Sequence, residues 1–334
     1  MNIGYKTCIA LFVLITGFTA CHRSGKKEDK TVHIIFDSDI GPDYDDVGAI
    51  TILHVMADQG EAKILATVAS NKYEGIAGVL DVFNTYFHRS DIPIGVPKGD
   101  AVSMGASQHW TDTLLAKYPH AITRNDQVPD AVALYRRILS EQPDQSVTIV
   151  TVGFLTNMAN LLASAPDSVS SLSGMELIKK KVKLLVTMGG KFPSGREFNI
   201  FNDPAGSRNA LENWPTKVLF SGSEIGEKIK TGLPLIHDTA ITGDPAKDVF
   251  SISIPLNPAD SAGRMSWDET TVLIAVRGYE PYFDVREGKI KVADDGGNTW
   301  DAAGKGQFYL VEKMPYPQIA DTINALMMKQ PLEQ

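Results

Sequence analysis

The chain has 334 residues, of which 43% are hydrophobic, and its formal net charge at pH 7 is -8. This length and composition suit one large globular domain or two small ones. The acidic balance argues against nucleic acid as a partner, because basic surfaces bind the phosphate backbone, but it does not exclude an uncharged nucleoside.

The first residues have the features of an export signal. Lys6 supplies a positive charge, and an apolar run from Cys8 to Ala20 follows it. This run is too short to span a bilayer comfortably. Small residues precede Cys21, and this pattern resembles a bacterial lipoprotein signal, which is cleaved before the cysteine that receives the lipid. An ordinary secretory signal cut near Ala20, or an uncleaved anchor, is the alternative.

We therefore expect residues 1–20 to be a signal peptide, residues 21–30 a tether and residues 31–334 a single domain. Cys8 and Cys21 are the only cysteines, so the mature domain has none to pair and must depend on its hydrophobic core. The expected location is that of an exported bacterial lipoprotein on the periplasmic or cell-surface side. Only the N-terminal lipid is expected to contact the membrane.

A cluster of acidic residues follows the first predicted strand of the domain, at 32–36. A Gly41-Pro42 turn leads to a predicted helix from about residue 45. The aspartates of this stretch are Asp37, Asp39, Asp43, Asp45 and Asp46. So many carboxylates repel one another unless a cation lies among them, and Ca2+ accepts a flexible shell of oxygen ligands. A solvated turn that caps the helix is the alternative, although one or two aspartates would suffice for it.

Two other motifs match part of this stretch. An EF-hand loop requires a glutamate at its twelfth position, where this chain has Gly48. The sequence Asp37-Ser38-Asp39 resembles the nucleophile motif of haloacid-dehalogenase-type phosphatases, with Asp37 as the nucleophile. That family usually has Thr or Val where this chain has Gly41, and it has no use for the later aspartates. The phosphatase remains an alternative.

Strand and helix patterns alternate along the rest of the chain. Strands are predicted at 62–69, 92–96, 147–152, 183–188 and 217–220, with a late β-pair formed by 289–292 and 308–312. Helices are predicted at 75–89, 131–139, 155–162, 203–213, 224–230, 268–276 and 318–328. Residues 98–129 are predicted to form a long loop, in which Trp110 either closes over a ligand or anchors the loop to the body.

The alternation predicts an α/β fold with an open, mainly parallel (mixed) sheet and helices on both faces. Ligands bind such sheets beyond the carboxyl ends of the strands. The aspartate cluster lies at such an end, and so do Asn71, the Val152-Gly153 turn and the Gly189-Gly190 turn. We expect these features to converge on one site.

Two pairs of residues farther along the chain suit a ligand. Glu197 and Asn199 would point the same way in an extended segment, where a carboxylate and an amide suit the hydroxyls of a sugar. Capping of the next helix is the alternative. Trp267 and Asp268 begin a predicted helix. Asp268 either caps this helix or completes a cation shell, and Trp267 either stacks on a flat ring or belongs to the core.

Several segments occur in an order that resembles the inosine-uridine-preferring nucleoside hydrolase family. They are DSDIGPDYDDVGAI, ATVASN, VTVGFLTNMANLL, MGG with GREFNIFNDP, and SWDETTVL. The resemblance extends from about Val32 to about Gly278. It implies a nucleoside hydrolase-like fold, usually in homodimers or homotetramers. It also implies Ca2+-dependent hydrolysis of the N-glycosidic bond of ribonucleosides to ribose and free base.

The resemblance also implies a role for individual residues. Asp39 would be the catalytic residue, which ligates Ca2+ and takes a proton from the attacking water. The other metal ligands would be Asp46, the carbonyl oxygen of Val152, and Asp268. The substrate contacts would be Asp45, Asn71, Glu197, Asn199 and Trp267. Asp37 would be a supporting group.

The chain departs from the family pattern at two places. Pro42, Asp43 and Tyr44 stand where the family commonly has one residue, so Asp43 has no assigned role. Many members have a histidine, proposed to protonate the leaving base, where this chain has Trp267. A purine-preferring branch has tryptophan there, which favours purine nucleosides as substrates. The change leaves no obvious general acid, and His109 in the long loop is a candidate.

A nucleoside-binding lipoprotein without turnover is a rival interpretation. Such a protein would keep the sugar contacts and lose the Ca2+ acids, and all of those acids are present. Asn298 and Trp300, which follow the matched segments, could also reach the ligand.

Overall fold

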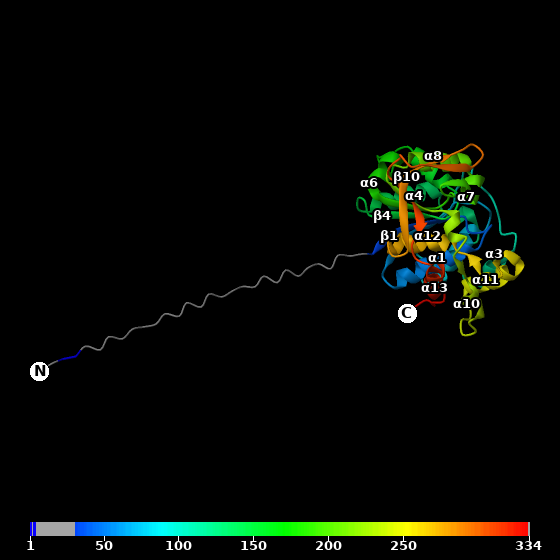
Figure 1. The fold of residues 1–334 in the computed structure, drawn as a ribbon, viewed down its shortest axis with the longest axis horizontal. Coiled ribbons are helices and arrows are strands. Elements are labelled where there is room, and N and C mark those ends of the chain that lie inside the picture. Colours follow the sequence, from blue (N-terminus) through cyan, green and yellow to red (C-terminus); the bar gives the residue numbers. More distant parts are fainter. Residues whose placement is uncertain (2, 5–30, 333–334) are drawn as a thin grey trace. The chain divides into compact units, whose positions relative to one another are not determined.

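The computed structural model describes residues 1, 3–4 and 31–332, and residues 31–334 form one compact unit (Figure 1). The predicted signal peptide, the tether and Cys21 lie outside the described residues. Within the part of the chain that the structure describes, no helix is long and apolar enough to cross a membrane.

A ten-stranded sheet forms the centre of the domain. In spatial order its strands are β3 (Ile94–Gly95), β2 (Ala62–Ala69), β1 (Val32–Ser38), β4 (Val147–Thr151), β5 (Val182–Met188), β7 (Lys217–Ser221), β12 (Gln307–Glu312), β10 (Phe283–Val292), β11 (Gly297–Asp301) and β6 (Ser194–Arg196). The first seven strands in this order are parallel, and the last three are antiparallel to their neighbours. The fold is therefore the predicted α/β fold with an open, mainly parallel, mixed sheet.

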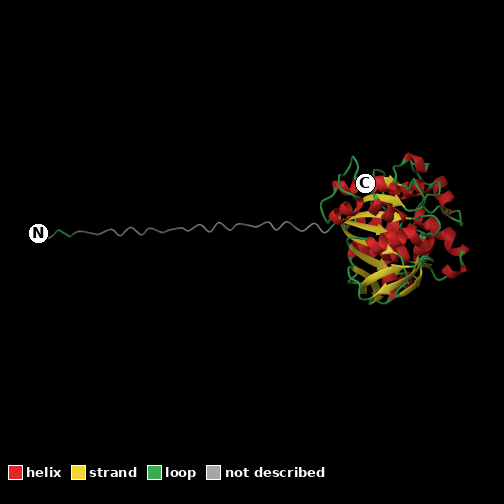
Figure 2. Cartoon of the chain, turned by 90° about the horizontal axis from the view of Figure 1, so that it is seen from above, coloured by secondary structure: helices red, strands yellow, loops and turns green. Residues whose placement is uncertain are grey.

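Helices cover both faces of this sheet (Figure 2). The first face is covered by α1 (Asp45–Asp58), α2 (Ile76–Tyr86), α3 (Trp110–Lys117), α11 (Pro245–Leu256), α12 (Trp267–Arg277) and α13 (Tyr316–Met327). The second face is covered by α4 (Ala131–Glu141), α5 (Thr156–Ala163), α6 (Gly174–Lys181) and α8 (Pro204–Asn213). Short elements include α7 (Phe198–Asn202), α9 (Ser223–Gly226), α10 (Leu233–His237) and a separate hairpin of β8 (Lys230–Thr231) with β9 (Arg264–Met265).

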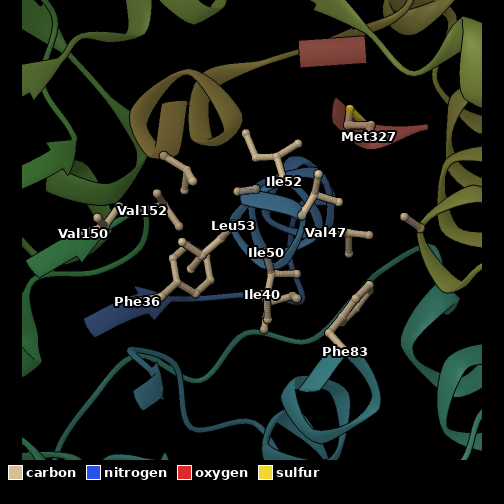
Figure 3. Close-up of a cluster of buried hydrophobic side chains, with 14 of the residues drawn as sticks. Phe36, Ile40, Val47, Ile50, Ile52, Leu53, Phe83, Val150, Val152 and Met327 are labelled. Atoms are coloured by element: carbon tan, nitrogen blue, oxygen red, sulfur yellow. The ribbon is translucent and has the colours of Figure 1, made fainter. Parts of the chain in front are cut away.

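The continuous apolar run of β1 follows from this double coverage. Successive side chains of a strand point to opposite faces, and here both faces are buried. Phe36 belongs to the core of the first face and Ile35 to that of the second. Figure 3 shows Phe36 of β1 between Val150 of β4 and Ile50 of α1. The pairing of β1 with both β2 and β4 therefore lies deep in the core.

The structure corrects several of the predicted elements. Segment 289–292 pairs with β11, whereas 308–312 pairs with the first half of β10, so the late β-pair was wrongly matched. The ten-residue β10 is shared between two partners, which a pattern of short apolar runs does not reveal. The predicted helix at 224–230 is reduced to α9, because β8 begins at Lys230. Helices α6, α10 and α11 were missed.

The predicted loop at 98–129 contains α3 and a short 3-10 helix, η1 (Asn125–Gln127). Trp110 begins α3 and is 1% exposed within the core of the first face. The indole therefore anchors the segment to the body, which is one of the two roles predicted for it.

The order of the strands determines where a ligand can bind. The chain moves from β1 to β2 on one side and returns to β4 on the other side of β1. A crevice opens at the carboxyl ends of strands where the order reverses in this way. The aspartate cluster follows β1, and Val152 follows β4, so both reach this crevice.

Candidate active site

A cavity of about 340 Å³ lies at the carboxyl ends of the central strands. Most of the predicted site residues line it, although they come from distant parts of the sequence. The lining includes Asp39, Asp45, Asp46, Val152, Glu197, Asn199, Trp267 and Asp268, together with Asp43, Met188, Arg196, Phe198, Ser223 and Glu227.

Buried carboxylates form the floor of this cavity. Asp45, Asp46 and Asp268 each place a carboxylate oxygen within 4.8 Å of the others. Asp39 is 4% exposed. Burial, and then the negative charge of neighbouring aspartates, raises the pKa of Asp39, Asp46 and Asp268 well above its ordinary value. The fold thus holds these acids where ionisation is costly without a compensating cation.

Arg264 of β9 supplies one such cation and was missed in the sequence. Its guanidinium is 3.0 Å from Asp45 Oδ1 and 3.5 Å from Asp260 Oδ2, and it also contacts the carboxylate of Asp43. The side chain is buried, and its guanidinium carbon lies 4.7 Å from the ring centre of Tyr44. Asp43 therefore has a role after all, as one of the acids that hold Arg264.

Arg264 leaves the rest of the cluster uncompensated. No basic side chain among residues 31–332 forms an ion pair with Asp39, Asp46 or Asp268. Asp46 accepts a hydrogen bond from the Ser38 hydroxyl at 2.5 Å. An all-oxygen set of buried, unpaired carboxylates suits a hard divalent cation such as Ca2+. The residues present therefore fit the ion that the resemblance implies.

The turn after β4 brings the backbone close to this cluster. Val152 lines the cavity, and its carbonyl oxygen accepts a hydrogen bond from Asn199 Nδ2 at 3.0 Å. A carbonyl oxygen has a second lone pair for another partner. A Cβ on Gly153 would lie 2.4 Å from Ser70 Oγ and 2.5 Å from the backbone nitrogen of Asp39. Only glycine permits this approach of β4 to the loop after β1.

Asp37 and Asn71 do not line the cavity but form hydrogen bonds with residues that do. Asp37 is fully buried and accepts hydrogen bonds from Tyr135 Oη and Asn157 Nδ2, each at 2.9 Å. Burial raises its pKa to about 7. Asn71 Nδ2 donates to the carbonyl oxygens of Asp39 and Met104 at 3.1 and 2.6 Å. Neither side chain lines the cavity, so the ribose contact predicted for Asn71 remains a prediction.

Glu197 and Asn199 lie at the start of α7 and not in the extended segment that the sequence suggested. Glu197 caps this helix, because its carboxylate accepts hydrogen bonds from the backbone nitrogens of Asn199 and Ile200 at 2.7 and 3.2 Å. It also accepts one from Gly190 N at 3.1 Å. Burial, opposed by these bonds, raises the pKa of Glu197 to about 7. Both residues still line the cavity, so capping and a place in the site coexist.

Trp267 forms a wall of the cavity. Its indole Nε1 donates to the carbonyl oxygen of Ser223 at 2.8 Å, and the Arg264 guanidinium carbon lies 5.0 Å from its ring centre. A Cβ on Gly226 would lie 2.4 Å from the indole, so the glycine of α9 makes room for it. The ring is held in place and faces the cavity beside Asp268.

Three other candidates lie away from the cavity. Trp300 packs in a cluster of aromatic rings with Phe192 and Tyr309. Asn298 Nδ2 donates to the carbonyl oxygen of Lys191 at 2.9 Å. His109 is exposed and lies 3.1 Å from Asp112. None of the three lines the cavity.

Comparisons with known proteins identify the class to which this fold and site belong. The family model described as "Inosine-uridine preferring nucleoside hydrolase" matches residues 34–325. The chain therefore belongs to the inosine-uridine preferring nucleoside hydrolase family.

Curated relatives match part of the chain. A "Pyrimidine-specific ribonucleoside hydrolase RihA" from Enterobacter sp. (strain 638) is 30% identical over 190 residues, which are 51% of this chain and 53% of that protein. A protein of the same name from Salmonella dublin is 27% identical over 236 residues, 65% of this chain and 68% of that one. The chain spans about half the length of the first curated relatives that it matches.

Solved structures show the same fold over most of the chain. A plant nucleoside hydrolase, PpNRh1, superposes with a TM-score of 0.67 at 19% identity, over 89% of this chain and 99% of its own. A purine-preferring ribonucleoside hydrolase from Gardnerella vaginalis superposes with a TM-score of 0.68 at 16% identity, over 89% and 99%. These similarities establish the nucleoside hydrolase-like fold.

Proposed function

We propose that this protein hydrolyses the N-glycosidic bond of ribonucleosides in a Ca2+-dependent reaction that yields ribose and free base. The observation that carries the proposal is the group of buried carboxylates, Asp39, Asp46 and Asp268. They form no ion pair with a basic residue of the described domain, and they line the cavity beside Glu197 and Asn199. A protein that only bound the sugar would have no need to bury these costly acids. Family membership supports the same reaction class.

Asp39, Asp46, Asp268 and the Val152 carbonyl would hold the cation. Bound Ca2+ would supply positive charge that orients a water molecule and lowers its pKa. Asp39, ionised when that charge compensates its burial, would accept a proton from the water as it attacks the anomeric carbon. Asp39 would then act as the general base from the floor of the cavity.

Side chains on the walls of the cavity would position the nucleoside. The Glu197 carboxylate and the Asn199 amide would contact the ribose hydroxyls, and such bonds strengthen as the ring acquires oxocarbenium character. Asp45, which lines the cavity, is a further proposed ribose contact. Asn71 is also a proposed ribose contact, although in this structure its amide donates to the carbonyl oxygen of Asp39 and does not line the cavity. The Trp267 ring would stack on the base. A purine offers this ring more contact area than a pyrimidine, so we propose a purine preference.

The test is release of reducing sugar from a panel of purine and pyrimidine ribonucleosides, with and without a calcium chelator. The protein used would comprise residues 22–334. We expect chelator-sensitive release that is fastest with purines. Sugar release that is equal with and without the chelator, or no release from any nucleoside, would contradict the proposal.

Two matched variants separate the hydrolase from the phosphatase. Asp39→Asn should lower kcat by about 10³-fold or more, because general base catalysis and a charged ligand are lost together. Asp37→Asn should lower it far less, because Asp37 lies behind the cavity. A phosphatase would show the opposite order, since Asp37 would be its nucleophile, and it would release phosphate from a phosphomonoester.

The location and assembly of the protein are further parts of this proposal. We propose that the protein is exported and that a lipid on Cys21 anchors it to the membrane on the periplasmic or cell-surface side. We also propose that the enzyme forms homodimers or homotetramers. Labelled fatty acid should enter the wild-type protein and not a Cys21→Ser variant. Light scattering of the 22–334 protein should give two or four times the chain mass, and a monomer would overturn the oligomer.

A further inference from the structure

A second groove lies at the opposite end of the sheet from the active site. Its volume is about 1160 Å³. Residues near the amino ends of four parallel strands line it, namely Val32 of β1, Thr148 of β4, Leu184 of β5 and Lys217 of β7. The catalytic cavity is lined by residues at or beyond the carboxyl ends of the same strands. The sheet therefore separates the two.

The charge of this groove is opposite to that of the whole chain. Its lining contains the lysines Lys179, Lys183, Lys217, Lys289 and Lys305, and a single acidic residue, Glu280. Lys305 pairs with Glu287 at 3.0 Å. The other four ammonium groups form no ion pair with any residue in the range 31–332. A protein with a net charge of -8 thus gathers lysines along one groove.

The groove also includes the amino end of β1. Val32, the first residue of β1, is part of the lining. The expected tether adds further positive charge, because residues 22–30 contain Arg23, Lys26, Lys27 and Lys30 but only Glu28 and Asp29. Ten residues of chain reach at most about 35 Å when fully extended. A lipid on Cys21 would therefore keep residue 31, which precedes β1, within about 35 Å of the membrane.

We propose that the lysine-lined groove is a docking surface for the anionic phospholipid headgroups of the membrane to which the protein is anchored. The inference rests on the proposed lipid anchor and is independent of the proposed catalytic activity. Lysines near an anionic bilayer are attracted to its negative surface potential, whereas the acidic remainder of the molecule is repelled. The amino ends of the strands then face the lipid, and the active-site cavity opens toward the aqueous phase from which a nucleoside arrives.

The test measures binding of the 22–334 protein to vesicles, so that the lipid does not contribute. Both cores lie within the compact unit 31–334, which is therefore expected to fold without the signal peptide. Co-sedimentation is measured with phosphatidylglycerol-containing vesicles and with pure phosphatidylcholine vesicles, at low and at high salt. We expect binding to the anionic vesicles alone, which weakens as salt screens the charges.

Two triple variants with equal net charge identify the surface. The first replaces the exposed groove lysines by glutamine (Lys179→Gln, Lys183→Gln, Lys217→Gln). The second replaces exposed lysines outside the groove lining (Lys191→Gln, Lys228→Gln, Lys291→Gln). The groove variant should bind anionic vesicles about a hundredfold more weakly, since each lysine near such a surface contributes a factor of about five. The control variant should bind within about twofold of the wild type.

Several outcomes would overturn the inference. These are equal loss in both variants, no binding at low salt, equal binding to phosphatidylcholine, and binding to soluble polyphosphate without binding to anionic vesicles. Sugar release is assayed on the same preparations. An inactive protein that still binds anionic vesicles would contradict the proposed hydrolase activity and support the docking surface. An active protein that does not bind the vesicles would support the hydrolase activity and contradict the docking surface.

Discussion

Arg264 divides the acidic cluster into two groups of different purpose. Its guanidinium compensates Asp43, Asp45 and Asp260, and it does not contact Asp39 or Asp268. A buried arginine among three acids is a structural cation. Asp39, Asp46 and Asp268 have no such partner, and they are the acids that we propose as metal ligands.

Replacement of Arg264 by glutamine should be strongly destabilising. The change leaves buried carboxylates without their cation, which costs about 3–5 kcal/mol of the free energy of unfolding. Urea denaturation measures the loss. Arg277→Gln serves as the control, because Arg277 pairs with Glu61 at 2.7 Å while both side chains are partly exposed, and such a pair contributes about 1 kcal/mol or less. Equal costs for the two variants would show that Arg264 does not hold the cluster.

Glu197 should make the stability of the domain depend on pH. Burial raises its folded-state pKa from 4.5 to about 7. Between these values the unfolded chain has released a proton that the folded protein still binds. The free energy of unfolding should therefore fall as the pH rises from about 4.5 to 7, by up to about 3 kcal/mol from this group.

The Glu197→Gln variant should show a smaller fall over this window, measured by urea denaturation at a series of pH values. Glu176→Gln is the control. Hydrogen bonds from Ser173 lower the pKa of the exposed Glu176, so its contribution is lost below pH 4.5 and outside the window. If the free energy of unfolding changed with pH equally in the wild type and in Glu197→Gln, Glu197 would be ionised throughout this pH range.

The elements of the fold position the site through a few close contacts. The end of β4 approaches the loop after β1 closely at Gly153, and α1 approaches α12 closely at Gly48, where a Cβ would lie 2.2 Å from Glu269 Oε1. These contacts join segments more than a hundred residues apart. The first contact holds the end of β4 beside Asp39, and the second holds α1 beside α12.

Gly153→Ala should weaken both the fold and the metal site. The added methyl group collides with Ser70 Oγ and Asp39 N, and overpacking of this kind costs about 1–3 kcal/mol. Calorimetry should show weaker Ca2+ binding, because the Asp39 backbone must move. Gly99→Ala is a matched control, since a Cβ there meets no atom within 4 Å. Unchanged Ca2+ affinity in Gly153→Ala would show that the contact at Gly153 does not position the metal ligands.

The whole molecule should be more stable with Ca2+ than without it. The folded domain gathers Asp39, Asp46 and Asp268, and the unfolded chain scatters them, so an ion held by these acids would favour the folded state. At a Ca2+ concentration one hundred times Kd, binding adds about 2.7 kcal/mol. For a domain of this size, Tm should rise by about 5 °C.

Thermal unfolding with Ca2+, with Mg2+ and with a chelator measures this effect. An Asp268→Asn variant should lose most of the Ca2+-dependent rise, whereas Asp301→Asn, at the exposed end of β11, should keep it. A rise that survives in Asp268→Asn would place the ion elsewhere.

The sequence by itself determined the class of fold and the residue types of the site. Alternating apolar strands and amphipathic helices specify a mainly parallel sheet, because periodicity is a local property. The ordered motifs from Asp39 to Asp268 likewise pointed to the family that the model match confirms. The acids were identifiable because five aspartates after a buried strand are costly in any fold.

Only the tertiary structure decided which acids are compensated and by what. Arg264 lies 219 residues from Asp45 in the sequence, and no local pattern marks it as a partner. The sharing of β10 between two strands and the short helix at Glu197 also depend on distant neighbours. The lysine groove is likewise formed by strand ends far apart in the chain. Each of these features depends on long-range packing, which burial and charge determine only after the sheet has brought the segments together.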